Sequence, residues 1–234
     1  MHPLEQLRYV ARGWESLDDL PVPEVAQVLA ELAEDSPGSL LHACRRLIEY
    51  FPSSGRLWWL SARALSAPEP MEGIWEAADE LLEDPTGKRL AEALPAGVGV
   101  SVLGPVAGAV AGTLRRRRAE DKTGRKKGRG PSMLLVSALA GGPDALLVQA
   151  GAARQVPDLV GRGRVIWVVV PRGTVLPGPL WVQLLERAQA TGGVEVVQPE
   201  AFSALAGPDG LSGARELLST PTCPPVAELL GWRS

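Results

Sequence analysis

The segment MLLVSALAGGPDALLVQAG, residues 133 to 151, contains two short apolar runs separated by a turn. The runs MLLVSAL at 133–139 and ALLVQ at 145–149 have the length and composition of strands buried in a sheet. Between them, Gly142-Pro143-Asp144 has the composition of a tight turn. The segment therefore predicts two neighbouring strands.

Three further strands are predicted, one before this segment and two after it. Valines alternate with small residues from 98 to 103, and the apolar runs VIWVVV at 165–170 and VEVV at 194–197 follow later. A helical pattern at 179–190 is ended by Gly192-Gly193, and beyond Pro199 one short helix is predicted around residues 214–218. Strands that alternate with helices indicate an α/β fold, here a small Rossmann-like parallel sheet with flanking helices over residues 96–234.

The first part of the chain has helical periodicity instead. Apolar residues recur at helical spacing from 4 to 94, and prolines with Ser36 mark helix starts. Residues 1–95 are therefore predicted to form an all-helical domain ahead of the α/β domain. Four tryptophans are expected in the core of the protein; these are Trp58, Trp59, Trp75 and Trp181.

The net charge of −3 is distributed unevenly along the chain. Residues 1–96 contain 8 Lys and Arg against 17 Asp and Glu, a net charge of −9. Residues 115–129 contain 9 basic and 2 acidic residues, a net charge of +7. The basic character is thus one local cluster, which argues against a general polyanion-binding surface. We expect a basic, mobile loop at about residues 119–131.

The uncharged run before this cluster leaves several interpretations open. Residues 94–114 followed by arginines match a single membrane span with a cytosolic anchor, but the run is mostly Gly, Ala, Val and Pro, and Gly104-Pro105 breaks it. We therefore favour a strand, a turn and a helix, and consider a membrane partner the weaker alternative. The cluster also offers a nucleic-acid-binding alternative, whose residues are Arg115, Arg116, Arg117, Arg118, Arg125, Lys126, Lys127 and Arg129.

Motifs for several kinds of chemistry are absent from the sequence. It has no P-loop, no HExxH and no Cys and His cluster at metal spacing, so neither a metal nor a cofactor is predicted. Acid or base chemistry would have to use carboxylates such as Asp144 or Asp209, but each lies in a Gly-Pro-Asp turn, where the usual role of Asp is to fix the turn. The two cysteines, Cys44 and Cys223, form no disulfide framework, which favours a reducing compartment and predicts a cytoplasmic protein. The Ala, Gly, Pro and Arg content is typical of a GC-rich bacterial genome.

The second half of the chain resembles a known superfamily. The run at 133–151, then a helix, then RVIWVVVPRGTVLPGPLW at 164–181 is similar to the Rossmann-like domain shared by the initiation factor 2B alpha, beta and delta subunits and methylthioribose-1-phosphate isomerase. In this match, Gly142-Pro143-Asp144 takes the place of the family's turn and Gly151 that of a later glycine. Proteins of this superfamily also have a helical domain ahead of the Rossmann-like one.

Departures from the family pattern affect the predicted function. The isomerases use a Cys after an early strand and an Asp in a later one, whereas here the first strand has no Cys and the Asp position falls at Val136 or Ser137. The interval from Leu114 to Ser132 is also short for the family's strand and helix units. The resemblance thus implies a truncated relative without the catalytic pair.

The sequence predicts a non-catalytic regulatory or interaction protein, a homodimer or one with a protein partner, that binds a phosphorylated metabolite. The alternatives are a nucleic-acid-associated protein and a sugar-phosphate isomerase. A ligand of such a sheet lies beyond the C-terminal ends of the parallel strands. Arg154 and Arg172, which are expected near these strand ends, have the chemistry to hold a phosphate. Each could equally be an ordinary surface arginine. The candidate ligand-binding residues are Gly104, Ser137, Asp144, Gly151, Arg154 and Arg172.

Overall fold

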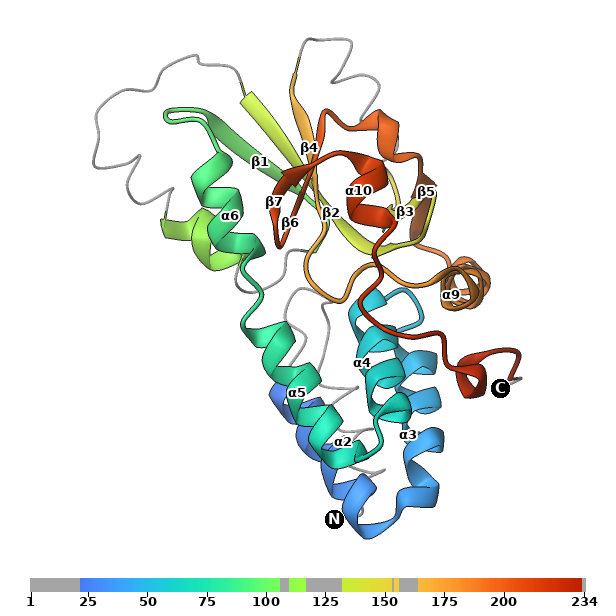
Figure 1. Ribbon diagram of the computed structural model, residues 1–234. Coiled ribbons are helices and arrows are strands. Elements are labelled where there is room, and N and C mark those ends of the chain that lie inside the picture. Colours follow the sequence, from blue (N-terminus) through green and yellow to red (C-terminus); the bar gives the residue numbers. More distant parts are fainter. Residues whose placement is uncertain (1–21, 106–109, 117–131, 153, 156–163, 233–234) are drawn as a thin grey trace.

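Strand β2 (Ser132–Gly141) is the centre of the sheet in the computed structural model (Figure 1). The structure describes residues 22–105, 110–116, 132–152, 154–155 and 164–232. On one edge of β2, β1 (Gly99–Leu103) pairs with residues 132–136 and β3 (Leu146–Gln149) pairs with residues 138–141. β4 (Ile166–Val169) pairs along the opposite edge. The two strands predicted at 133–151 are thus present, and β2 is paired along both of its edges.

The described strands form one mixed sheet of seven strands, and the predicted α/β class is confirmed. β1, β2, β4 and β6 (Ala204–Gly207) are parallel, as expected. The other three pairs of described strands are antiparallel. In two of them, β2 with β3 and β6 with β7 (Gly210–Ser212), the turn between the strands is too short for a parallel crossover. The order is β5-β3-β2-β4-β6-β7, with β1 beside β2 and β5 at Val194–Val197.

The β6–β7 hairpin is the main element that the sequence did not predict. The short strand pattern is concealed by Ala, Gly and Ser, which have little strand preference. Parallel pairing with β4 stabilises β6 in spite of this composition. The helix that follows, α10 (Ala214–Leu218), confirms the prediction at 214–218.

Each face of the sheet has its own core. On one face, Val136 and Val168 pack with Phe202 of the segment before β6 and with Leu218 of α10. That segment contains the short helix η1 (Pro199–Ala201). On the other face, Leu135 and Val169 pack under α6 (Thr86–Ala93) and under the helical residues 110–116. The uncharged run at 94–114 therefore contains strand β1 as well as helix, and no helix in the described ranges is long and apolar enough to cross a membrane.

Four of the described helices form a layer against one end of the sheet (Figure 1). Trp58 and Trp59 are fully buried there and Trp181 nearly so, as predicted. Trp75 is 42% exposed, which corrects the prediction that it lies in the core: it is on the outer face of its helix. The helices are α2 (Val22–Asp35), α3 (Pro37–Tyr50), α4 (Gly55–Ser66) and α5 (Pro70–Leu82).

The helical layer meets the sheet at the start of α4. A Cβ built on Gly55 would lie 2.7 Å from the carbonyl oxygen of Thr174 and 3.0 Å from Cα of Ala140. Only a glycine allows the backbone of α4 to come this close to β2 and the loop after β4. The buried cluster around Trp58 and Trp59 continues from the helices to β2, β3 and α9 (Gly178–Thr191). The division into domains 1–95 and 96–234 stays a prediction.

The segment after α10 returns along the helical layer and is fixed there by two arginines. The Nε and Nη2 groups of Arg45 donate to the carbonyl oxygen of Glu228, which lies just before the end of the short helix η2 (Ala227–Leu229). The Arg187 guanidinium lies 3.7 Å from the centroid of the Trp232 ring and donates to the Trp232 carbonyl oxygen. The Trp232 ring also contacts Trp58, with 5.7 Å between centroids. These contacts tie the C-terminal segment to α3, α4 and α9.

We predict that Gly55→Ala destabilises the protein, because the new methyl group would clash with backbone atoms, which cannot relieve the clash by changing rotamer. Overpacking of this kind costs about 2 kcal/mol, which lowers the melting temperature by roughly 4–8 °C in a chain of this size. Gly38→Ala is the matched control, because a Cβ there meets nothing within 4 Å. In a helix that change raises stability by about 0.5 kcal/mol. Equal melting temperatures for the two variants would contradict the described joint.

Candidate functional site

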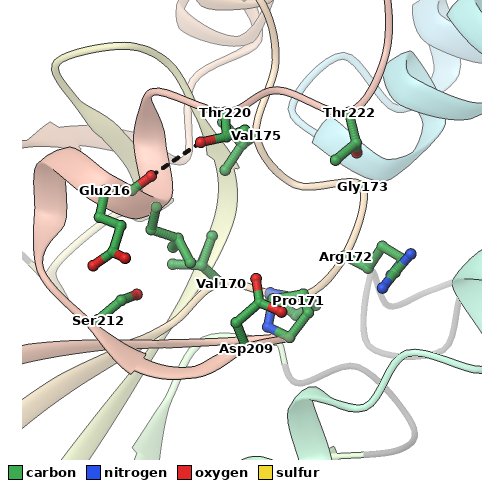
Figure 2. Close-up of a pocket in the computed structure, with 12 residues that line it drawn as sticks. Val170, Pro171, Arg172, Gly173, Val175, Asp209, Ser212, Glu216, Thr220 and Thr222 are labelled. Carbon is green, nitrogen blue, oxygen red and sulfur yellow. Dashed lines mark hydrogen bonds between the residues drawn. The ribbon is translucent and has the colours of Figure 1, made fainter.

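The C-terminal ends of β4 and β6 frame a pocket of about 320 Å³ (Figure 2). The loop after β4 forms one wall, the β6–β7 turn and α10 form another, and the segment after α10 closes the top. In α/β sheets, ligands bind at this end of the strands. The residues discussed below that line the pocket are Arg172, Asp209, Ser212, Glu216, Thr220 and Thr222.

Arg172 is held at one side of the pocket by two carboxylates of the helical layer. Its backbone N–H donates to Oδ2 of Asp84 at 3.1 Å, and its Nη1 lies 3.4 Å from Oε2 of Glu80. Glu80 also pairs with Arg63 at 2.9 Å. The Nε atom of Arg172 is buried and, within the described residues, has no hydrogen-bond partner. One N–H of this guanidinium is thus a buried donor without an acceptor among the described residues, which is energetically unfavourable.

Asp84 is buried between α5 and α6 and organises the surroundings of Arg172. Its Oδ1 accepts hydrogen bonds from the backbone N–H and the hydroxyl of Thr86, which fixes the start of α6. Burial lowers the pKa of the nearby Arg56 guanidinium, and the Asp84 carboxylate opposes this shift. The Nη2 of Arg56 donates to the carbonyl oxygen of Leu81 at 3.0 Å. The charge of Asp84 is therefore balanced inside the protein.

The opposite side of the pocket presents carboxylates and hydroxyls. Figure 2 shows Ser212 and Glu216 across the pocket from Arg172. The Oγ atom of Ser212 is buried and lacks a partner in the part of the chain that is described. Thr220 donates to the backbone oxygen of Glu216 at 3.2 Å. The pocket therefore has a cationic side and a side rich in hydrogen-bond acceptors.

The C-terminal segment connects the pocket to the buried tryptophans. The indole N–H of Trp59 donates to Oγ1 of Thr222 at 2.8 Å, and Thr222 lines the pocket. The ring of Trp59 also lies under the guanidinium of Arg63, 5.4 Å from the ring centroid. A change in the position of Thr222 would thus alter its hydrogen bond with Trp59, which is buried in the core of the helical layer.

Of the six predicted ligand-binding residues, only Arg172 lines this pocket. Gly104 and Ser137 do lie together, since a Cβ on Gly104 would be 3.6 Å from the Ser137 carbonyl oxygen. Gly104 has φ +85, a conformation that favours glycine. Ser137 is buried and, by strand alternation, shares the face of Leu135, whereas the pocket lies over the face of Val170. The two groups are on opposite faces of the sheet.

The other three predicted residues lie outside the pocket. Asp144 is exposed in the turn between β2 and β3, in the structural role that its motif indicates. Gly151 follows β3 with φ +89, and Arg154 is exposed shortly after it. Sequence reasoning missed Ser212, Glu216, Thr220 and Thr222 because the segment after Pro199 gave little indication of a strand pair. It did weigh Asp209 as a candidate for acid or base chemistry, but favoured a role in fixing the turn.

The basic cluster falls largely outside the described residues. Arg115 and Arg116 are exposed at the end of the helical residues 110–116, and Arg116 donates to Oγ1 of Thr113 at 3.4 Å. The rest of the predicted nucleic-acid-binding residues, with the loop at 119–131, are not described. They are Arg117, Arg118, Arg125, Lys126, Lys127 and Arg129.

Both cysteines are buried in the core of the helical layer, away from the end of β1 where an isomerase-like Cys would follow. Cys44 is on α3, and Cys223 is in the C-terminal segment. Burial raises the pKa of each thiol to about 12. Neither group is therefore prepared to act as a thiolate nucleophile. His42 is exposed on α3.

No family model and no curated protein matches the chain. Solved structures do match. A chain of the tetrameric eIF2B β2δ2 complex from Chaetomium thermophilum has a TM-score of 0.68 at 14% identity, over 93% of this chain and 92% of that chain. Translation initiation factor eIF-2B from Pyrococcus horikoshii has a TM-score of 0.63 at 12% identity, over 92% of this chain and 98% of that chain.

The enzyme side of the predicted superfamily matches as well. 5-Methylthioribose 1-phosphate isomerase from Pyrococcus horikoshii has a TM-score of 0.60 at 13% identity, over 93% of this chain and 86% of that chain. At such identities the likeness is one of fold. The chain thus has the fold of eIF2B subunits and methylthioribose-1-phosphate isomerase, as the resemblance predicted.

Proposed function

We propose that this protein is a non-catalytic regulatory or interaction protein that binds a phosphorylated metabolite in the pocket of Figure 2. The observation that carries the proposal is the polarity of the pocket. Arg172 lines one side of the pocket, and one of its N–H groups has no partner in the described residues. Glu216 lies across the pocket from Arg172 (Figure 2), and Asp209 also lines the pocket. A sugar monophosphate complements this pocket, because its phosphate accepts hydrogen bonds from arginine and its hydroxyls donate hydrogen bonds to carboxylates.

Charge selects among phosphorylated ligands. Arg172 already pairs with Glu80, and two further carboxylates line the pocket, so its surroundings are not strongly positive. A ligand with several phosphates would be repelled by Asp209 and Glu216. A ligand with one phosphate and several hydroxyls avoids this repulsion, and the pocket volume lies at the lower end of the range for small-molecule sites.

The placement of reactive groups supports a binding role instead of catalysis. The resemblance assigns catalysis to a Cys and an Asp, and the match puts the Asp near Ser137. Ser137 is buried on the face of the sheet away from the pocket, and both cysteines are in the helical core. The groups that line the pocket suit binding through charge and hydrogen bonds.

The connections of the pocket support a regulatory role. Arg172 is tied to α5 through Glu80, and Thr222 is tied to Trp59 of α4. A ligand that moves either residue changes contacts of the helical layer. We further propose a cytoplasmic homodimer or complex, by analogy with the eIF2B β2δ2 complex, which is tetrameric.

A thermal-shift screen tests the proposal. We expect sugar monophosphates such as ribose 5-phosphate to raise the melting temperature, by roughly 5–10 °C near a hundred-fold excess over Kd. Free ribose and pyrophosphate are expected to raise it less. Arg172→Gln should abolish the response.

Arg63→Gln is the matched control, because it removes the other ion pair of Glu80 without removing a pocket residue. It should keep the response to ribose 5-phosphate. The proposal fails if no phosphorylated ligand changes the melting temperature. It also fails if nucleic acid binds instead, in a salt-sensitive manner that replacement of Arg115 and Arg116 abolishes.

Thiol chemistry tests the non-catalytic assignment. Because only thiolates react readily and both thiols are buried with a raised pKa, we expect no reaction of the native protein with Ellman's reagent at about pH 8. In denaturant both cysteines should react. Rapid reaction of one cysteine in the native protein, slowed by a sugar phosphate, would instead favour the isomerase alternative.

A further inference from the structure

Helix α5 has an apolar stripe on its outer face. Met71, Trp75 and Leu82 are 46%, 42% and 53% exposed, respectively. Their spacings of 4 and 7 residues place them within about 40° of one another around the helix axis. The face of α5 next to the stripe, with Ile74 and Ala78, is buried against α2 and α4. The stripe is therefore an ordered surface at the margin of a helix that packs on the helical layer.

Exposed carboxylates accompany the stripe along its whole length. They belong to Glu72, Glu76, Asp79 and Glu83, and no Lys or Arg occurs in α5. Within the described ranges, no ion pair involves any of these four side chains. Like charges four residues apart, such as Glu72 and Glu76, repel each other in a helix. A partner with positive charges would relieve this repulsion.

We infer that the outer face of α5 is a docking surface for a basic, amphipathic helix of a partner protein. The stripe extends for about 16 Å, or three turns, which matches one helix laid along it. Apolar residues of such a helix would pack on Trp75 and Met71, since tryptophans dominate binding energy and methionines adapt to different partners. The carboxylate row would pair with its Lys and Arg residues and accelerate association.

Charge complementarity favours this occupant over the helical layer of a second copy. Residues 1–96, which include α5, have a net charge of −9, so two such layers would repel each other. The inference is independent of the metabolite pocket, because the exposed face of α5 contains none of the residues that line it.

Fluorescence anisotropy with a labelled peptide tests the inference on the full chain. The probe is a four-turn helix with Leu at i, i+3, i+4 and i+7 and Lys elsewhere. We expect Trp75→Ser to weaken binding by about tenfold or more. Val182→Ser on α9 is the matched control, because Val182 is 51% exposed but far from acidic α5, and it should leave binding unchanged.

A second variant separates charge from packing. Glu72→Gln with Glu76→Gln and Glu83→Gln should weaken binding at low salt and make it less sensitive to added salt. Circular dichroism confirms that each variant is folded. Equal binding of the Trp75 and Val182 variants, or of a scrambled peptide of the same composition, would overturn the inference. So would self-association of the protein alone, in sedimentation velocity, that Trp75→Ser abolishes, because a second copy would then be the occupant.

Discussion

The contact between Gly55 and the loop after β4 determines how the two parts of this protein meet. Because α4 begins with its backbone against Thr174 and Ala140, the tryptophans one turn later are buried where the helices face the sheet. The same loop contains Arg172 and Gly173, and a Cβ on Gly173 would lie 2.7 Å from a Leu81 methyl group. Close backbone packing at this joint thus positions the arginine on which the proposed site depends.

Two carboxylates, those of Asp84 and Glu80, make most of the polar contacts where the helical layer meets the loop after β4. Asp84 holds the Arg172 backbone and the start of α6, while Glu80 shares its two oxygens between Arg63 and Arg172. The Arg172 side chain is consequently fixed before a ligand arrives, which lowers the entropic cost of binding. Within the described residues, its Nε and the Ser212 hydroxyl are the buried polar atoms of pocket-lining residues that have no hydrogen-bond partner.

The sequence predicted the α/β class and five strands because each strand is marked either by a short valine- and leucine-rich run or, in β1, by valines that alternate with small residues. It did not predict the β6–β7 hairpin, whose small residues depend on pairing with β4, nor therefore most of the pocket. Arg172 was identified because it follows a strong strand directly. Gly104 directly follows β1 and Ser137 lies inside β2, and the face of the sheet that Ser137 occupies depends on strand register. Trp75 was expected in the core because periodicity alone does not show which face of α5 is covered.

In the proposed complex, the Nε–H of Arg172 donates a hydrogen bond to the phosphate of a sugar monophosphate. Proton–nitrogen correlation NMR of the arginine Nε–H groups tests this directly, with the Arg172 signal assigned by its loss in Arg172→Lys. We predict that ribose 5-phosphate moves this signal in a saturable manner and that free ribose does not. An unchanged Arg172 signal while the exposed Arg154 signal moves would contradict the account.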